Sequence, residues 1–425
     1  MSADPRMKPS GLAWAPVVPA HWTVKKLGFL ASLQSGDTTA ADDIKDSGPY
    51  PVYGGNGLRG YTDRFTHRGE YALIGRQGAL CGNINYAKGE FWASEHAVVV
   101  TPREEIAVVW LGELLRAMNL NQYSLSAAQP GLAVDAIAAL KVPIPPLAEQ
   151  RAIADYLDRE TARLDALVAA KERLLAILAE KRRALITHAV TRGLDPAVRL
   201  RDSGMPWLGE IPTHWNVQRV AVLFRERDER CEPELPLLEV SINSGVVLRE
   251  FADDRIETTA ADFNTYKVAR AGDIVFNKMR MWQGAVGVAP QDGLVSPDYL
   301  VAAPSNGFLP EFAGLLFRTK AFSAECARES HGIVWDRLRL YWEGFRDIRI
   351  QLPPIEEQRS IVAHIHRETA KLDALRDATE RTIVLLKERR SALITAAVTG
   401  RIDVGRAESL DRVVGDNTEG VRVPQ

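Results

Sequence analysis

Two long stretches of the chain carry hydrophobic residues at helical spacing. Between Leu147 and Arg192, leucine, valine and isoleucine recur every three, four or seven positions with charged residues between them, which predicts an amphipathic helix. No glycine or proline interrupts this stretch, whereas two prolines precede it and Gly193 follows it. Proline suits only the start of a helix and glycine suits its end. The pattern therefore predicts one helix over residues 147–193, roughly 60 Å long at 1.5 Å per residue.

The same helical stretch is repeated 208 positions later. "PPLAEQRAI" begins at Pro145 and "PPIEEQRSI" begins at Pro353, and a gapless alignment of the two copies leaves roughly half of the positions identical. This repeat predicts a second helix over residues 355–400. A shorter repeat precedes each divergent region, "GLAWAPVVPAHWTV" from Gly11 and "GMPWLGEIPTHWNV" from Gly204. The chain therefore consists of two tandem units, each with a preamble, a divergent region and a long helix.

The divergent regions, about 24–144 and 217–352, show the pattern of strands and turns. Short β-rich runs such as "YALIG", "AVVVT", "GDIVF" and "YLVAA" alternate with glycine-rich and asparagine-rich turns,. Shorter helical stretches, "AVVWLGELLRAM" and "PEFAGLLFRTKAF", lie between them, and "LKVPIPP" and "IRIQLPP" end the two regions. We expect an α+β fold with curved sheets. The expected divisions are residues 1–146, 147–193, 194–354, 355–400 and a disordered tail at 401–425.

An amphipathic helix of this length needs a partner along its whole length. The similar surface within this chain is its second copy, so we expect an antiparallel coiled-coil pair. The expected contacts join Leu164, Leu175 and Leu178 with their repeat counterparts Leu372, Ile383 and Leu386.

Composition narrows the class of protein. The chain has 425 residues, 46% of them hydrophobic and 25% charged, which predicts a soluble globular protein with more than one domain. Without a long apolar run or a signal peptide, it is expected to be cytoplasmic and to have no membrane contact. Three separated cysteines, Cys81, Cys231 and Cys326, support neither a disulfide framework nor a zinc site,. We expect buried thiols.

Motifs for catalysis and for metal binding are absent from the sequence. No phosphate-binding loop, nucleophile elbow, zinc-protease motif or kinase motif set occurs. "IPPL" and "LPPI" lack the flanking residues of an amino-methyltransferase loop. His364 and His366 are two residues apart on a predicted helix and so point to different faces,. We predict no catalytic residue, no metal and no cofactor in this chain.

Two glycine-rich loops of the first divergent region carry side chains that suit nucleic-acid binding. "GGNGLRG" presents Asn56 and Arg59, and "GRQGALCG" presents Arg76 and Gln77. Arginine pairs with guanine through two hydrogen bonds, and asparagine or glutamine pairs with adenine in the same way. Ordinary hairpin turns with polar tips would give the same pattern. The net charge of −2 argues against nucleic acid unless basic residues gather on one face or a partner shares the contacts.

In the second divergent region, "VFNKMRMWQGAVG" gathers polar side chains around Trp282. The candidates are Asn277, Lys278, Arg280 and Gln283, and "SHGIVWDRLRL" adds His331 and Arg337. Strand alternation places Asn277 and Lys278 on opposite faces. We expect Arg280 or Gln283 to contact a base edge and Lys278 to contact phosphate. A structural turn around one core tryptophan would explain the stretch equally well.

Taken together, these motifs resemble the specificity subunit of type I restriction-modification systems. The resemblance rests on the tandem plan, "PAHW" and "PTHW", "PIPPLAEQR" and "QLPPIEEQR", the helical "LDAL" and "ALIT", and "GDIVFNKMRMWQGAVG". It extends over nearly the whole chain up to about Asp403, and the doubled proline-to-helix motif is its most specific part.

The resemblance implies a DNA-binding subunit without catalytic activity. Two target-recognition domains would each read one half of a bipartite double-stranded DNA sequence, and the antiparallel helices would set the gap between the halves. The expected partners are two modification subunits, which bind S-adenosylmethionine and methylate adenine, and restriction subunits that translocate and cleave DNA. A coiled-coil scaffold without sequence-specific DNA binding is the alternative, and a free-standing methyltransferase-nuclease would need motifs that the sequence lacks.

Overall fold

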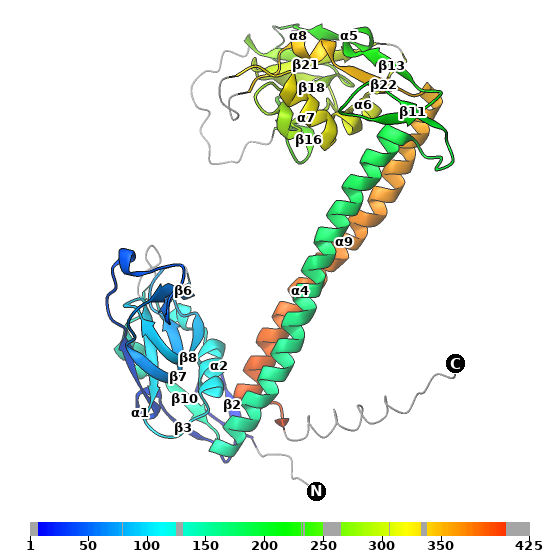
Figure 1. The fold of residues 1–425 in the computed structure, drawn as a ribbon. Helices are drawn as coiled ribbons and strands as arrows, with labels where there is room; N and C mark the ends of the chain where they lie inside the picture. The colour runs from blue at the N-terminus through cyan, green and yellow to red at the C-terminus, as the bar shows by residue number, and fades with distance from the viewer. Residues whose placement is uncertain are drawn as a thin grey trace, which may run out of the picture. The chain divides into compact units, whose positions relative to one another are not determined.

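The chain divides into two units. A computed structural model describes residues 7–78, 80–124, 131–230, 232, 234–249, 265–305, 307–332 and 338–404. Unit 1 contains residues 1–172 and 381–425, and unit 2 contains residues 173–380. Each unit therefore combines one divergent region with part of both long helices (Figure 1).

Unit 1 is built on a six-stranded sheet in the order β4-β9-β7-β8-β5-β6. The strands of unit 1, inside and outside this sheet, are β1 (Met7–Pro9), β2 (Val17–Pro19), β3 (Thr23–Lys26), β4 (Ala31–Ser35), β5 (Tyr50–Gly54), β6 (Gly57–Thr62), β7 (His67–Gly75), β8 (Ile84–Ala93), β9 (Ala97–Pro102) and β10 (Lys141–Ile144). Its shorter helices are α1 (Leu27–Leu30), η1 (Ala41–Asp43), α2 (Val108–Ala117), η2 (Leu120–Tyr123) and α3 (Val134–Ala138). Helix α2 buries Trp110, Leu111 and Leu114 in the core beside β7 and β8. The predicted strands "YALIG" and "AVVVT" are confirmed as parts of β7 and β9.

Unit 2 repeats this plan around a four-stranded sheet in the order β14-β21-β18-β19. The strands of unit 2, inside and outside this sheet, are β11 (Leu200–Asp202), β12 (Glu210–Pro212), β13 (Asn216–Arg219), β14 (Phe224–Arg227), β15 (Leu238–Ser241), β16 (Gly245–Leu248), β17 (Lys267–Ala269), β18 (Ile274–Asn277), β19 (Val286–Val288), β20 (Gly293–Val295), β21 (Tyr299–Pro304) and β22 (Arg349–Leu352). Its shorter helices are α5 (Val220–Leu223), η4 (Met281–Gln283), α6 (Pro310–Phe317), α7 (Lys320–Arg328) and α8 (Trp342–Asp347). The helical stretch expected over "PEFAGLLFRTKAF" is confirmed, and it consists of α6 and the start of α7. The two helices are separated at Arg318, and Thr319 caps α7 by accepting a hydrogen bond from the Phe322 amide.

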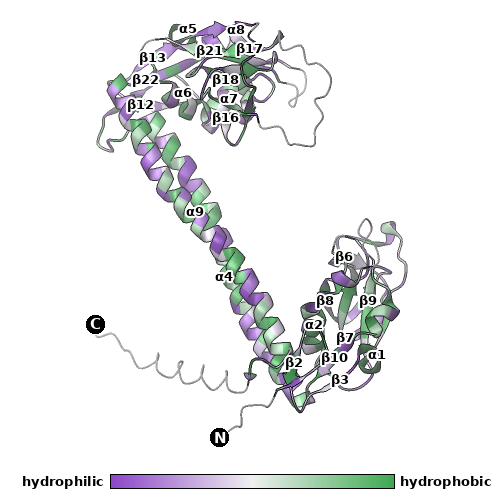
Figure 2. Cartoon of the chain, turned by 180° about the vertical axis from the view of Figure 1, so that it is seen from behind, coloured by the Kyte–Doolittle hydropathy of each residue, from purple (hydrophilic) through white to green (hydrophobic). Residues whose placement is uncertain are grey.

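The two long helices are α4 (Leu147–Arg192) and α9 (Ile355–Val398). In unit 1, Asp165 pairs with Arg390 at 2.9 Å, and in unit 2 the repeat counterparts Asp373 and Arg182 lie 3.6 Å apart. A further unit 1 pair joins Glu172 and Lys387 at 3.7 Å, so residue numbers rise on one helix as they fall on the other. The helices therefore run antiparallel in each unit, and hydrophobic and hydrophilic residues alternate along both (Figure 2).

Antiparallel packing corrects the expected leucine contacts. The pairing of Asp165 with Arg390 places Leu164 across from the α9 residues near 391, roughly 28 Å along that helix from Leu372. The register in unit 2 likewise places Leu178 across from residues near 377 rather than from Leu386. The expected contacts of Leu164 with Leu372 and of Leu178 with Leu386 are therefore wrong, because the antiparallel pairing in each unit places other residues across from these two leucines. Leu164, Leu178 and Ile383 are buried, whereas Leu175, Leu372 and Leu386 are half-buried, and contact of Leu175 with Ile383 stays a prediction.

The repeated glutamate and glutamine at the start of each long helix fasten that helix to its unit. Glu149 accepts hydrogen bonds from His21 and Trp22, and Glu357 binds His214, so the "HW" of each preamble contacts the "EQR" of the same unit. The next residues, Gln150 and Gln358, are buried. Gln150 accepts a hydrogen bond from the amide of the α2 N-cap at 3.2 Å. Gln358 accepts one from the amide of the α6 N-cap at 2.8 Å.

The end of each long helix packs in the unit where the other helix starts. Ala189 and Val190 of α4 lie in the unit 2 core with Trp215, and Ala397 and Val398 of α9 lie in the unit 1 core with Trp22. Gly193 and Gly400 follow these ends with φ of 79° and 70°, a backbone conformation that favours glycine.

The segment after α9 begins inside the fold. Val404 is buried and Ile402 packs against the unit 1 core, so a disordered tail starting at residue 401 is wrong for these residues, and 405–425 lie outside the described residues. Cys81 and Cys326 are buried free thiols, as expected, whereas Cys231 lies outside the described residues. Among the helices the structure describes, none is long and apolar enough to cross a membrane.

Candidate nucleic-acid interface

In unit 2, the candidate residues that the structure describes lie on the loop after strand β18 and at His331. Strand β18 ends at Asn277, and the chain turns through η4 to Gly284, whose φ is 86°. The Lys278 carbonyl accepts from the Leu340 amide at 3.0 Å, and His331 exchanges backbone hydrogen bonds with Arg339. We call residues 277–284, 296–298, 331–332 and 338–341 the unit 2 loop cluster.

The candidates in this cluster divide into residues held by their own loop and residues that face outward. Asn277 Oδ1 accepts from the Met279 amide at 2.9 Å, and Lys278 is half-buried with its ammonium 3.3 Å from the Pro297 carbonyl. Burial is the main cause that lowers the pKa of Lys278, and the positive charge of Lys267 lowers that pKa further. The side chains of Arg280 and Gln283 are exposed, and within the described residues neither makes a hydrogen bond or ion pair.

In unit 1, the two glycine-rich loops meet. A Cβ on Gly75 would lie 2.2 Å from the Gly55 carbonyl oxygen, so only glycine permits this approach. Asn83 Nδ2 lies 3.3 Å from Asn56 Oδ1, which ties the β5–β6 turn to the loop after β7. We call residues 54–59, 76–78, 80–83, 94–96 and 131–132 the unit 1 loop cluster.

The unit 1 candidates also differ in how much they are held. Asn56, Arg59 and Gln77 are exposed, and the Arg59 side chain lies over Gly54. Arg76 is half-buried and donates to Ser35 Oγ at 3.1 Å. The first three are therefore the residues of this cluster that a large ligand can reach.

The two clusters occupy the same place in the two sheets. The loop 76–83 joins β7 to β8 and the loop 278–285 joins β18 to β19, and these strands hold equivalent positions in the two strand orders. Leu132 donates to the Arg76 carbonyl as Leu340 donates to the Lys278 carbonyl. The "GRQGALCG" and "NKMRMWQG" stretches, which share little sequence, are therefore structural counterparts.

Residues that sequence reasoning missed complete both clusters. Arg339 and Tyr341 are exposed beside the η4 turn, and Arg339 lies 3.8 Å from Met279 Sδ. His96 and Asn83 join the unit 1 cluster through the Arg76 amide and Asn56. Asn83 directly follows "GRQGALCG" and Arg339 lies within "SHGIVWDRLRL", so side-chain chemistry on these stretches could have found both. Arg337 lies outside the described residues.

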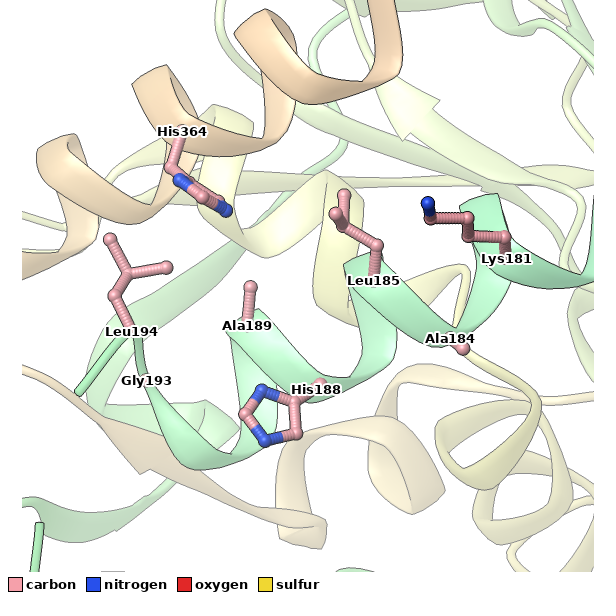
Figure 3. A pocket seen from close by; sticks show the side chains of 8 residues that line it. All are labelled: Lys181, Ala184, Leu185, His188, Ala189, Gly193, Leu194 and His364. Carbon is pink, nitrogen blue, oxygen red and sulfur yellow. The ribbon is translucent and has the colours of Figure 1, made fainter. Parts of the chain in front are cut away.

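The described residues hold no group of three or more histidines, cysteines or carboxylates that could bind a metal. Figure 3 shows His188 on α4 and His364 on α9 at the edges of a hollow of about 340 Å³ that also contains Leu185, Ala189 and Leu194. The lining is mainly apolar, and the Nδ1 atom of His364 lies 3.2 Å from a guanidinium nitrogen of Arg367.

Comparison with known proteins gives matches along most of the chain. Residues 19–175 match the family model described as "Type I restriction modification DNA specificity domain". The EcoprrI specificity subunit of Escherichia coli is 47% identical over 139 residues, which cover 32% of this chain and 35% of that protein. The aligned segment thus spans about a third of that relative. The EcoDI specificity subunit of Escherichia coli is 22% identical over 436 residues, covering 94% of this chain and 93% of that protein.

Solved structures share the fold. A chain described under "complex assembly and conformational transition of the type I R-M system" has a TM-score of 0.61 and 18% identity, covering 91% of this chain and 99% of that chain. The HsdS subunit from Thermoanaerobacter tengcongensis has a TM-score of 0.51 and 17% identity, covering 91% and 98%.

Proposed function

Because the chain belongs to the family of type I restriction-modification specificity subunits, we propose that it reads a bipartite DNA sequence, one half with each unit. The observation that carries this proposal is the equivalence of the two loop clusters. Each follows a central strand of its sheet and exposes arginine together with glutamine or asparagine, the side chains that read guanine and adenine in the major groove. Their different sequences suit two different half-sites.

The contacts of the residues in each cluster indicate which side chains can reach a base edge. Arg280 and Gln283 in unit 2, and Asn56, Arg59 and Gln77 in unit 1, are exposed and serve as candidates for base edges. Asn277 caps its own turn and Lys278 reaches the Pro297 carbonyl, so the phosphate contact expected of Lys278 stays a prediction. Arg339 is the better candidate for that contact because it is exposed beside the same turn.

The long helices act as the spacer, and partner subunits supply the chemistry. Each helix crosses from one unit to the other, so its length fixes how much chain separates the two clusters. We propose that two modification subunits dock on the repeated elements, hold S-adenosylmethionine and methylate adenine, and that restriction subunits join them. The chain itself is proposed to be non-catalytic.

Selection from a random DNA library tests this function. The full chain, purified with its co-expressed modification subunits, is expected to enrich two short fixed elements separated by a gap of constant length. Methylome sequencing of the source cell is expected to show adenine methylation at the same bipartite motif. Enrichment of one contiguous element, or of none, would contradict the proposal and favour a coiled-coil scaffold.

A further inference from the structure

Unit 2 contains a groove whose charge the readout of bases does not explain. It has a volume of about 700 Å³ and lies where α6 and α7 meet α4 and α9. Its charged and titratable lining consists of Arg182, Arg183, Arg318, Lys320, His366 and a single carboxylate, Glu180. For a chain with a net charge of −2, this is a strong local excess of positive charge.

The cations of the groove are only weakly neutralised by the protein. Arg318 donates to the backbone carbonyls of Ile242 and Asn243, which hold its guanidinium without cancelling its charge. Partial burial, and then the charge of Arg182, lower the pKa of Arg318, so the two guanidinium groups repel each other. Arg182 has one carboxylate, Asp373, at 3.6 Å, and within the described residues Arg183 and Lys320 have no ion pair.

At the equivalent position in unit 1, carboxylates accompany the cations. Helices α2 and α6 align without a gap from their N-caps, so Glu113 corresponds to Leu315 and Arg116 to Arg318. Glu113 is buried and pairs with Arg116 at 3.0 Å. On the long helix, Asp158 takes the place of His366. Burial, and then the carboxylates of Asp155, Glu113 and Glu70, raise the pKa of Asp158.

The basic groove adjoins the unit 2 loop cluster. A Cβ on Gly284, directly after the outward-facing Gln283, would lie 3.6 Å from Ser323 Oγ and 4.0 Å from the Arg318 carbonyl oxygen. The η4 turn therefore rests on the junction of α6 and α7, whose residues Arg318 and Lys320 line the groove. A DNA strand read by Gln283 would have its neighbouring phosphates near this junction.

We propose that this groove, formed by Arg182, Arg183, Arg318 and Lys320, binds the phosphate backbone of DNA beside the half-site read by unit 2, independently of sequence. The proposal rests on the proposed DNA recognition, and it makes the two half-sites unequal. Unit 2 would hold DNA through phosphates as well as bases, whereas unit 1, with carboxylates in the same place, would depend on its loop cluster and on partner subunits.

The test removes two cations that no carboxylate holds. The double variant Arg183→Gln/Lys320→Gln is compared with Lys25→Gln/Lys26→Gln, which changes the net charge equally at exposed positions on β3. Dissociation constants of the full chain with its modification subunits are measured between 50 and 200 mM salt on selected and on random DNA. Each lost phosphate contact reduces the magnitude of the slope of log K against log salt by about 0.9. The slope of the groove variant is therefore expected to be smaller by about 1.8 on both DNAs. Its preferred sequence should not change.

A second variant introduces the carboxylate of unit 1. Leu315→Glu places an acidic residue three positions before Arg318, as Glu113 stands before Arg116, and it is expected to lower the slope by about 0.9 by neutralising one cation. Circular dichroism and thermal unfolding identify a variant that fails to fold.

The outcomes separate this inference from the proposed function. A groove variant with the same slope as the β3 control overturns the inference, even if sequence selection stands. If DNA binding is unchanged but assembly with partner subunits weakens, the groove binds an acidic protein segment instead. Loss of slope on random DNA in a protein that selects no sequence would keep the groove and refute the bipartite reading. Absence of any DNA binding would refute both.

Discussion

Gln358 belongs to the repeated motif at the start of α9 and lies inside unit 2. Its side chain is fully buried. Oε1 accepts from the Leu309 amide at 2.8 Å, and Nε2 donates to the carbonyls of Pro353 at 2.8 Å and Gly307 at 3.2 Å. Substitution by alanine leaves one amide and two carbonyls without this partner. A buried polar group that loses its partner costs about 1–3 kcal/mol.

We expect Gln358→Ala to destabilise unit 2 by about 3 kcal/mol, since some of the freed groups can bind water. Hydrogen–deuterium exchange reports each unit separately, and amides protected by α6 and β22 should exchange about 100-fold faster, because 1.4 kcal/mol corresponds to a factor of ten. Gln150→Ala removes two such bonds from unit 1 and should cost about 2 kcal/mol there. The exposed Gln122, bonded to one carbonyl, provides the control, and Gln122→Ala should change exchange little.

The reasoning fails if Gln358→Ala leaves unit 2 exchange within a factor of about five of the unchanged chain. In that case the repeated glutamine would not fasten the helix to the domain. The same conclusion would follow if Gln150→Ala and Gln358→Ala accelerated exchange equally in both units, because each glutamine contacts only its own unit.

Further predictions concern readout, packing and spacing. Arg280→Ala or Gln283→Ala should cost about 1–3 kcal/mol against the preferred base and relax one position of one half-site in selection experiments; full affinity with an unchanged motif in both would make the turn structural. Leu178→Ala should cost about 2–5 kcal/mol in thermal unfolding and more than Leu175→Ala, because Leu178 is buried and Leu175 half-buried; equal losses would contradict this packing. Replacing residues 24–144 by the corresponding region of another specificity subunit should alter one half of the selected motif, and a change in both halves would refute independent units. An insertion of four residues near Leu178 adds roughly 6 Å and should lengthen the selected gap, and an unchanged gap would show that the helices do not set it.

The local pattern of the sequence determined the elements of this protein. Helix α4 begins at Leu147 and ends at Arg192, where prolines and a glycine bracket the hydrophobic periodicity. The repeat from Pro353 predicted α9, and the β-rich runs became β7, β9, β18 and β21. These features could be predicted because backbone conformation depends mostly on neighbouring residues and on the spacing of apolar side chains. The outward-facing Arg280 and Gln283 were found the same way, from side-chain chemistry on one loop.

Contacts between distant segments decided everything that depends on register. Leu164 faces the end of α9 and not its repeat counterpart, because the two helices run antiparallel. Arg339 reaches the η4 turn through a backbone bond between Lys278 and Leu340, and Lys278 turns inward toward Pro297. Arg318 meets the carbonyls of Ile242 and Asn243, and residues of α4 and α9 complete the basic groove around it. Each of these outcomes depends on which side chains a folded chain brings together across many intervening residues, and one-dimensional spacing does not contain that information.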